Sequence, residues 1–280
     1  MKISKLLMFT FITILLINCE ENRTSVTSDL RIIALSPSLV ETVFFLGGGK
    51  NIVGASSFCN YPKEAKNIPV VANVSDMNLE YAVKLKPDIV LLMPGQENIA
   101  AKLNLLNIKT LTVSQEKLDD ILNSFTVIGR EIGREQRAAA VKDSLRSVLG
   151  SYKSPAKNKT VLISAGREYG TGITYIFSTG RTGFLNDIVE LLGYSNSLDT
   201  PVPYPKIGAE TVLTIDPDII IDLVPSDISS SPEELLKDWE LFRTAKAWKN
   251  GSIFILKGDH TTIPGPRIFN LIKELNEKGL

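Results

Sequence analysis

Short, continuous apolar runs alternate with amphipathic segments along most of this chain. The runs have the length of strands, and their lack of polar alternation is typical of parallel strands that are covered on both faces. The amphipathic segments between them repeat apolar residues at three- and four-residue steps, as helices do. The alternation predicts an α/β fold in which mostly parallel sheets are flanked by helices. Strands are expected at 31–35, 52–54, 89–93, 109–113, 160–164, 219–221 and 252–256.

One helix–strand unit occurs twice, about one domain length apart. Segments 79–93 and 209–223 each carry a glutamate in second position and, at matching later positions, a Pro-Asp pair followed by an apolar run. In both segments the proline is expected to end a short helix, because it lacks a backbone donor and disfavours helix at the residue before it. A single copy would be an ordinary α/β connection. Two aligned copies indicate two similar lobes with a cleft between them.

A long stretch between the two copies has neither proline nor a strong turn signal. Apolar residues recur in it at helical spacing, and Gly129 and Gly133 are expected to cost roughly 1 kcal/mol each without ending the helix. The pattern predicts one rigid helix over 118–150, about 45 Å long. This helix would join an N-terminal lobe at 31–117 to a C-terminal lobe at 151–280.

The chain begins with the pattern of an export signal. Two lysines precede an uncharged apolar run at 6–17, which is shorter than the about 20 residues that a membrane span needs. Cys19 follows the run, with a leucine three residues before it, and this resembles a bacterial lipobox. The signal peptide is therefore expected to end at Cys19, which would be acylated, with 20–30 as a flexible tether. The alternative is a plain signal peptide with an incidental cysteine.

Composition limits the classes of function. The chain has 280 residues, 44% hydrophobic and 22% charged, with a formal net charge of zero, so charge gives no argument for nucleic-acid binding. Beyond Cys19 only Cys59 remains, and His260 is the only histidine, so no internal disulfide or multi-ligand zinc site is expected. Ser36 lies outside a Gly-x-Ser-x-Gly elbow, and the glycines at 47–49 lack the Walker spacing. An enzyme is not predicted.

The chain carries an ordered set of motifs, which are Arg31–Ser38 with Glu41, Val53–Ser57 with Tyr61-Pro62, Asn78–Glu80, Leu85–Asp88, Pro217-Asp218 and Pro264–Arg267. This set resembles the periplasmic substrate-binding proteins of ABC importers for cobalamin, haem and ferric siderophores, and most closely the cobalamin-binding type. That resemblance implies a class III fold, with two α/β lobes bridged by one long helix. It also implies a monomer that delivers its ligand to a membrane permease and its ATPase subunits, in the periplasm or on the outer face of the cytoplasmic membrane.

The resemblance also gives a role to the paired glutamates, Glu80 and Glu210. In the family, one surface glutamate on each lobe docks against arginines of the permease. Carboxylates on two lobes would fix orientation and steer the encounter more than they would add affinity. The alternative is that both are ordinary solvated residues at helix starts, where negative charge is favourable.

Ligand-binding residues are expected in the loops at strand ends, which in the family face each other across the cleft. Aromatic side chains there suit a flat corrin or porphyrin, and segments 76–80 and 203–205 are closest to the cobalamin binders. Those binders commonly place tryptophans in the cleft, however, whereas Trp239 and Trp248 lie in late helical segments. Another corrinoid, a haem or a ferric siderophore therefore stays open as the ligand. The candidate residues are Ser36, Pro37, Phe58, Tyr61, Met93, Arg167, Tyr169, Tyr204 and His260.

Three of the charged or titratable side chains could add specific contacts. A neutral imidazole at His260 could be an axial ligand of haem iron or cobalt, although most loop histidines are not. Arg167 and Arg181 could pair with carboxylates of a ligand, and solvated arginines are the alternative. A metal-ion-binding lipoprotein is a weaker alternative function, because that class supplies three or four His, Asp or Glu ligands. No resident metal or cofactor is expected.

Overall fold

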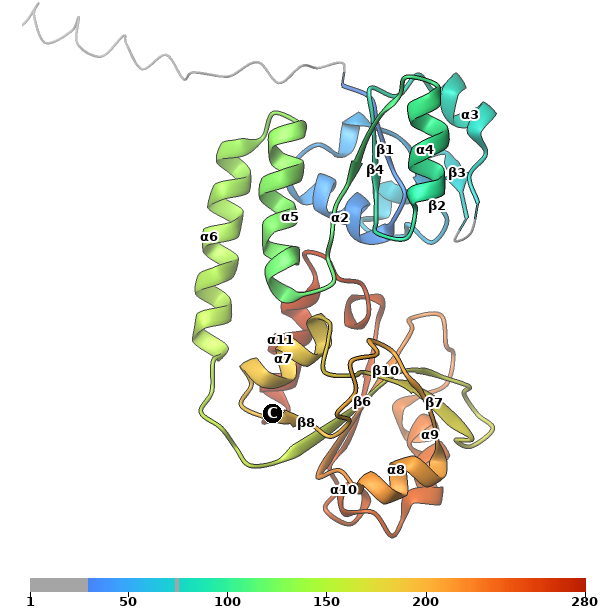
Figure 1. The fold of residues 1–280 in the computed structure, drawn as a ribbon. Coiled ribbons are helices and arrows are strands. Elements are labelled where there is room, and N and C mark those ends of the chain that lie inside the picture. Colours follow the sequence, from blue (N-terminus) through green and yellow to red (C-terminus); the bar gives the residue numbers. More distant parts are fainter. Residues whose placement is uncertain (1–29, 74–75) are drawn as a thin grey trace, which may run out of the picture.

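The computed structural model describes residues 30–73 and 76–280, which form two α/β lobes joined by paired helices (Figure 1). The predicted signal peptide, Cys19 and all but the last residue of the predicted tether lie outside the described residues. Of the described helices, none combines the length and the apolar character that crossing a membrane requires.

Among the described residues, the N-terminal lobe has a five-stranded sheet in the order β3-β2-β1-β4-β5, with all neighbours parallel. Alternate side chains of β1 explain its continuous apolar run. Ile32 packs under α2 and α5, while Ile33 packs on the opposite face against α3 and α4. The elements are β1 (Ile32–Ala34), α2 (Pro37–Phe45), η1 (Gly49–Asn51), β2 (Ile52–Ser56), η2 (Lys63–Asn67), β3 (Val70–Ala72), α3 (Leu79–Lys84), β4 (Ile89–Leu92), α4 (Glu97–Leu105) and β5 (Lys109–Thr112).

Within the described chain, the C-terminal lobe has a six-stranded sheet in the order β11-β10-β6-β7-β9, with β8 also paired to β6. Strands β6, β8, β10 and β11 are parallel, and β7 is antiparallel to both of its neighbours, which confirms mostly parallel sheets. The elements are β6 (Thr160–Arg167), β7 (Tyr175–Ser178), α7 (Phe184–Leu191), β8 (Ser195–Asn196), β9 (Lys206–Gly208), α8 (Ala209–Ile215), β10 (Ile219–Val224), α9 (Pro232–Lys237), η3 (Asp238–Phe242), α10 (Lys246–Lys249), β11 (Ile253–Lys257), η4 (Asp259–Thr261) and α11 (Ile268–Glu277).

The prediction of one bridging helix over 118–150 is wrong. The chain instead forms α5 (Leu118–Glu131) and α6 (Glu135–Tyr152), which lie side by side as a hairpin (Figure 1). Gly133 makes the turn with φ +65°, a conformation that glycine adopts without steric cost. A Cβ on Gly129 would lie 2.4 Å from the Cβ of Ala138, so its missing side chain lets the two helices approach. The two glycines therefore reverse the chain rather than weaken one helix.

The duplicated unit is confirmed, and the structure explains its Pro-Asp pair. The carboxylate of Asp88 accepts a hydrogen bond of 2.7 Å from the backbone N–H just before β1, and that of Asp218 accepts one of 2.8 Å from the first residue of β6. Each aspartate thus joins the start of one central strand to the start of its neighbour. The residues before the prolines, Lys86 and Asp216, also match, with left-handed φ values of 47° and 46°.

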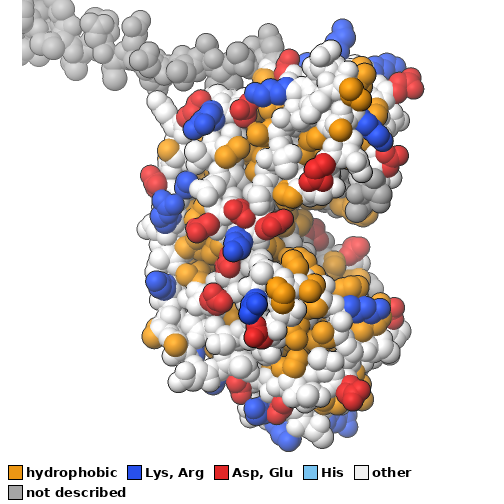
Figure 2. All heavy atoms as spheres, in the orientation of Figure 1, with side chains coloured by type: hydrophobic (Ala, Val, Ile, Leu, Met, Phe, Trp, Pro, Cys, Tyr) orange, Lys and Arg blue, Asp and Glu red, His pale blue; other side chains and the backbone are white. Residues whose placement is uncertain are grey.

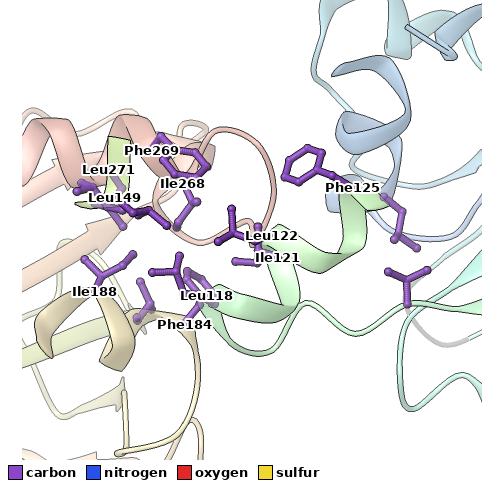
Figure 3. Packing of buried hydrophobic residues seen from close by; sticks show 14 of the residues in the cluster. Leu118, Ile121, Leu122, Phe125, Leu149, Phe184, Ile188, Ile268, Phe269 and Leu271 are labelled. Atoms are coloured by element: carbon purple, nitrogen blue, oxygen red, sulfur yellow. The ribbon is translucent and has the colours of Figure 1, made fainter. Parts of the chain in front are cut away.

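A continuous hydrophobic cluster runs from one lobe to the other beneath the helical hairpin (Figure 3). The start of α5 is fastened to the C-terminal lobe, because the N–H of Leu118 donates to Asp187 over 2.8 Å. Burying each large apolar side chain of the cluster is worth ~1.5–3 kcal/mol. The cluster includes Leu118, Ile121, Leu122 and Phe125 of α5, Leu149 of α6, Phe184 and Ile188 of α7, and Ile268, Phe269 and Leu271 of α11.

A buried ion pair also joins the lobes. The guanidinium of Arg267, just before α11, donates from Nε to Oε2 of Glu41 over 2.9 Å and from Nη2 to Oε1 over 2.6 Å. Glu41 lies in α2 and is only 3% exposed. Burial raises the pKa of its carboxyl, and the hydrogen bond and charge of Arg267 oppose that shift. The ring of Tyr61 covers the guanidinium, with 4.2 Å between the guanidinium carbon and the ring centroid.

Substitutions at three glycines test the hairpin turn. Gly129→Ala should destabilise the protein by ~1–3 kcal/mol, because the new methyl group meets Ala138. Gly133→Ala should cost ~1–2 kcal/mol because of its left-handed φ. Gly150→Ala in α6 is the control, since its Cβ would enter open space, and it should stabilise by ~0.5–1 kcal/mol. Urea unfolding of residues 20–280 measures all three, and equal effects would contradict this account of the turn.

A double-mutant cycle tests the ion pair between the lobes. Arg267→Met should destabilise the protein by ~3–5 kcal/mol, because it leaves the Glu41 carboxylate buried without a partner. The double variant Glu41→Met/Arg267→Met should recover most of that loss, since apolar replacement of a buried pair is often neutral. Urea midpoints of the single and double variants give the coupling free energy. Additive losses would mean that the two side chains stabilise the lobes independently.

Candidate functional site

The two lobes face each other across a cleft that is open on the side away from α5 and α6 (Figure 2). The start of α2, together with the short loop that joins it to β1, is part of this facing surface, because Ser38 of α2 lies against Gly265 of the C-terminal lobe. A Cβ on Gly265 would be 3.5 Å from the Cα of Ser38. In open α/β sheets, ligands bind outside the carboxyl ends of the strands, which is where this loop stands. The cleft is therefore the candidate ligand site.

The N-terminal wall brings several predicted residues together. Ser36 shares a hydrogen bond of 2.8 Å with Ser38, and the sulfur of Met93 lies 4.0 Å from the same Ser38 hydroxyl. Pro37 begins α2 directly beside them. Phe58 stands apart with φ 67° and a side chain that is 70% exposed. This wall thus offers hydroxyl and thioether groups together with one exposed aromatic ring.

The C-terminal wall has a hollow of about 400 Å³ lined by Tyr204 together with Ala165, Gly166, Phe177, Leu185 and Thr262. Tyr204 is 46% exposed, as its predicted role requires. Phe177 is 43% exposed, and it was not among the predicted ligand-binding residues. The alternation of Tyr175 to Ser178 in an antiparallel strand could have shown that Phe177 points outward. Two aromatic side chains therefore border this hollow.

Arg167 is buried in the C-terminal lobe rather than exposed in the cleft, and Tyr169 packs against it. The guanidinium of Arg167 is fully buried and forms ion pairs of 2.9 Å with Asp222 and 2.6 Å with Asp238. The ring of Tyr169 packs against it, and the Tyr169 hydroxyl donates to the carbonyl of Leu223 over 3.4 Å. Burial raises the pKa of Tyr169 to about 12. The prediction that the Arg167 guanidinium contacts the ligand is therefore wrong, whereas ligand contact by the partly buried Tyr169 stays a prediction.

Both tryptophans pack in the interior of the C-terminal lobe. Trp239 is fully buried, and its indole N–H donates to the Asp222 carboxylate over 3.0 Å. Trp248 packs against the same cluster from a partly buried position. Both indole rings therefore belong to the packing of this lobe and are not among the exposed aromatic rings of the cleft.

The remaining charged candidates are already paired within the chain. Nε2 of His260, in η4, lies 3.2 Å from a carboxylate oxygen of Glu274, so this nitrogen is not directed at a ligand. Arg181 donates to Asp199 over 2.9 Å. With Arg167 and Arg267, every arginine that the structure places in loops after the strands has an acidic partner in the chain. Residues 30–73 and 76–280 also contain no group of three His, Cys, Asp or Glu side chains arranged for a metal ion.

Glu80 and Glu210 occupy matching places in the first turns of α3 and α8. Both are exposed, and within the described chain neither carboxylate has a hydrogen bond or an ion pair. The two helices lie at the far ends of the two lobes (Figure 1). Each lobe thus presents one free carboxylate to solvent at an equivalent corner.

Comparison of the sequence with known proteins identifies its relatives. A family model described as periplasmic binding protein matches residues 32–260. A Bacillus subtilis protein named as an ABC transporter substrate-binding lipoprotein, YvrC, is 26% identical over 88% of this chain and 79% of its own. A vitamin B12-binding protein of Salmonella paratyphi A is 31% identical, over 68% of this chain and 71% of its own.

Solved structures share the fold over nearly the whole of their length. A possible iron-binding protein of Staphylococcus epidermidis superposes with a TM-score of 0.70 at 29% identity, covering 88% of this chain and 97% of that one. The vitamin B12-binding protein BtuF of Vibrio cholerae superposes with a TM-score of 0.74 at 23% identity, covering 88% and 94%. The chain therefore belongs to the periplasmic binding protein family, whose members serve ABC importers as substrate-binding proteins.

Proposed function

We propose that this substrate-binding protein of an ABC importer captures cobalamin or a related corrinoid in its interlobe cleft. The proposal is supported by relatives that match most of the chain, among them a vitamin B12-binding protein of Vibrio parahaemolyticus at 24% identity and a cobalamin-binding protein of Halobacterium salinarum at 26% identity. The permease and ATPase subunits of the importer would receive the ligand.

The charge of the cleft is the observation that carries this choice of ligand. A ligand with carboxylates, such as haem with its propionates or an acidic siderophore, is commonly held by free arginines. Here Arg167, Arg181 and Arg267 are each paired with an acidic side chain of the chain itself. Hydroxyls and exposed aromatic rings, such as those of Phe58 and Tyr204, suit a large ligand with neutral amides at its edge. A corrinoid has that chemistry.

Attachment to a membrane is the second part of the proposal. An acylated Cys19 would hold the domain on the outer face of the cytoplasmic membrane, and the YvrC relative is named as a lipoprotein. The monomer would then reach its permease through the tether at 20–30. Glu80 and Glu210 would dock on basic side chains of that permease, because both carboxylates are exposed and have no partner in the described chain.

Titration of residues 20–280 tests the ligand. Cyanocobalamin should bind one to one with a dissociation constant below about 1 μM in a calorimeter. Haemin should give neither comparable heat nor a Soret shift, because the cleft offers no free arginine for its carboxylates. A Soret shift without cyanocobalamin heat would move the assignment to haem. Heat from neither ligand would favour a ferric siderophore.

Substitution of both glutamates tests docking separately from ligand binding. Glu80→Ala/Glu210→Ala should abolish uptake of labelled cyanocobalamin by the host cells and leave the affinity of the purified protein unchanged, because both positions lie on the outer helices. Glu135→Ala is the matched control, since Glu135 is an exposed residue in the first turn of α6. Unchanged uptake in the double variant would rule out the docking role.

A further inference from the structure

The matching helices α3 and α8 share more than their glutamates. Three residues after each glutamate stands an exposed aliphatic side chain, Val83 at 41% and Leu213 at 39% exposure. Residues three apart lie on the same face of a helix, so each carboxylate has an apolar neighbour on the surface. The residue two positions after each glutamate faces the interior of its lobe and is fully buried. It is Ala82 in α3 and Val212 in α8. The two helices therefore present their surfaces in the same register.

The other exposed positions of the two helices do not match. Tyr81 of α3 corresponds to Thr211 of α8, and Lys84 corresponds to Thr214. Single exposed aliphatic residues are normal on protein surfaces. Here, however, a carboxylate and an aliphatic side chain are the two surface features that recur, while aromatic, cationic and hydroxyl side chains do not. The buried residues of the two helices already specify the fold, so the fold does not require the exposed glutamate and aliphatic residue to match. Their agreement therefore indicates that the two helices make the same kind of contact with a partner.

We propose that Val83 and Leu213 are apolar anchors of the permease-docking surface. Each would pack into an apolar pocket of the permease, next to the cationic side chain that pairs with Glu80 or Glu210. The inference rests on the proposed docking of the two glutamates and adds the residues that give it strength. The partner of this docking surface is an integral membrane permease. It would present a cationic side chain beside an apolar pocket at two places, separated by the distance between α3 and α8.

The physical roles of the two side chains differ. An exposed carboxylate steers and orients the encounter, but a solvated ion pair adds little affinity. An aliphatic side chain beside it excludes water when it is covered, and the charge pair then acts in a lower dielectric. Binding energy at such interfaces is concentrated in a few desolvated contacts. Val83 and Leu213 supply that contact at each corner of the molecule.

Photo-crosslinking in the host cells tests the inference directly. A photoreactive amino acid is placed in the full chain at Val83 or Leu213, and crosslinked membrane proteins are identified by mass spectrometry. Val127 and Val148 are the controls, because they are exposed to similar extents, 41% and 37%. They belong to α5 and α6, which lie on the other side of the molecule from α3 and α8 (Figure 1). Both test positions should crosslink to the same importer permease, and neither control position should.

Truncation of the anchors provides the functional measurement. Val83→Ala/Leu213→Ala should lower uptake of labelled cyanocobalamin about tenfold or more, while cyanocobalamin binding by the purified protein stays unchanged. Val127→Ala/Val148→Ala should leave uptake unaltered. Normal uptake in the anchor variant, with no permease crosslink at 83 or 213, would overturn the inference while docking through the glutamates stands. If Glu80→Ala/Glu210→Ala also keeps its uptake, docking itself is wrong.

Discussion

The ion pair between the buried Glu41 and the largely buried Arg267 joins segments that are 226 positions apart, one in each lobe, and its two directed hydrogen bonds constrain how the lobes meet. A buried pair of this kind contributes little net stability compared with apolar side chains of similar size, but losing one partner is costly. The shared hydrophobic cluster beneath α5 and α6 supplies the favourable free energy instead. The cluster thus holds the lobes together, and the directed hydrogen bonds of the ion pair constrain the orientation of one lobe relative to the other.

Because the hydrophobic cluster and the ion pair hold the lobes in place, the cleft can be lined by exposed side chains and still keep its shape. Phe58 and Tyr204 stay exposed, at 70% and 46%, because the lobes do not need them for cohesion. The buried contacts lie on the side of α5 and α6, and the ligand surface lies on the open side (Figures 1 and 2). A chain that placed its cohesive contacts in the cleft would have to break them to bind a ligand.

The duplicated unit and the strands β1, β2, β4, β5, β6, β10 and β11 could be predicted from the sequence, because each depends on patterns within about fifteen residues. The short strands β3, β7, β8 and β9 were not predicted. The reversal at Gly133 could not, since glycine propensity is a local cost and gives no sign that α6 packs against Gly129. Arg167 was misplaced for a similar reason. Its partners Asp222 and Asp238 lie 55 and 71 positions away, so the sequence around Arg167 does not indicate that its charge is buried. Phe177 was missed because β7 is short and antiparallel within a mostly parallel sheet.

The placement of α3 and α8 at the far ends of the lobes has a mechanical consequence. For a rigid body turning about a pivot, displacement grows with distance from that pivot. The lobes are fastened to each other at Glu41, Arg267 and the helical hairpin, so a small rotation there moves the outer helices farther than it moves the walls beside the joint. Any slight closure of the lobes around a ligand would therefore produce a larger change in the span between α3 and α8 than in the width of the cleft beside the joint.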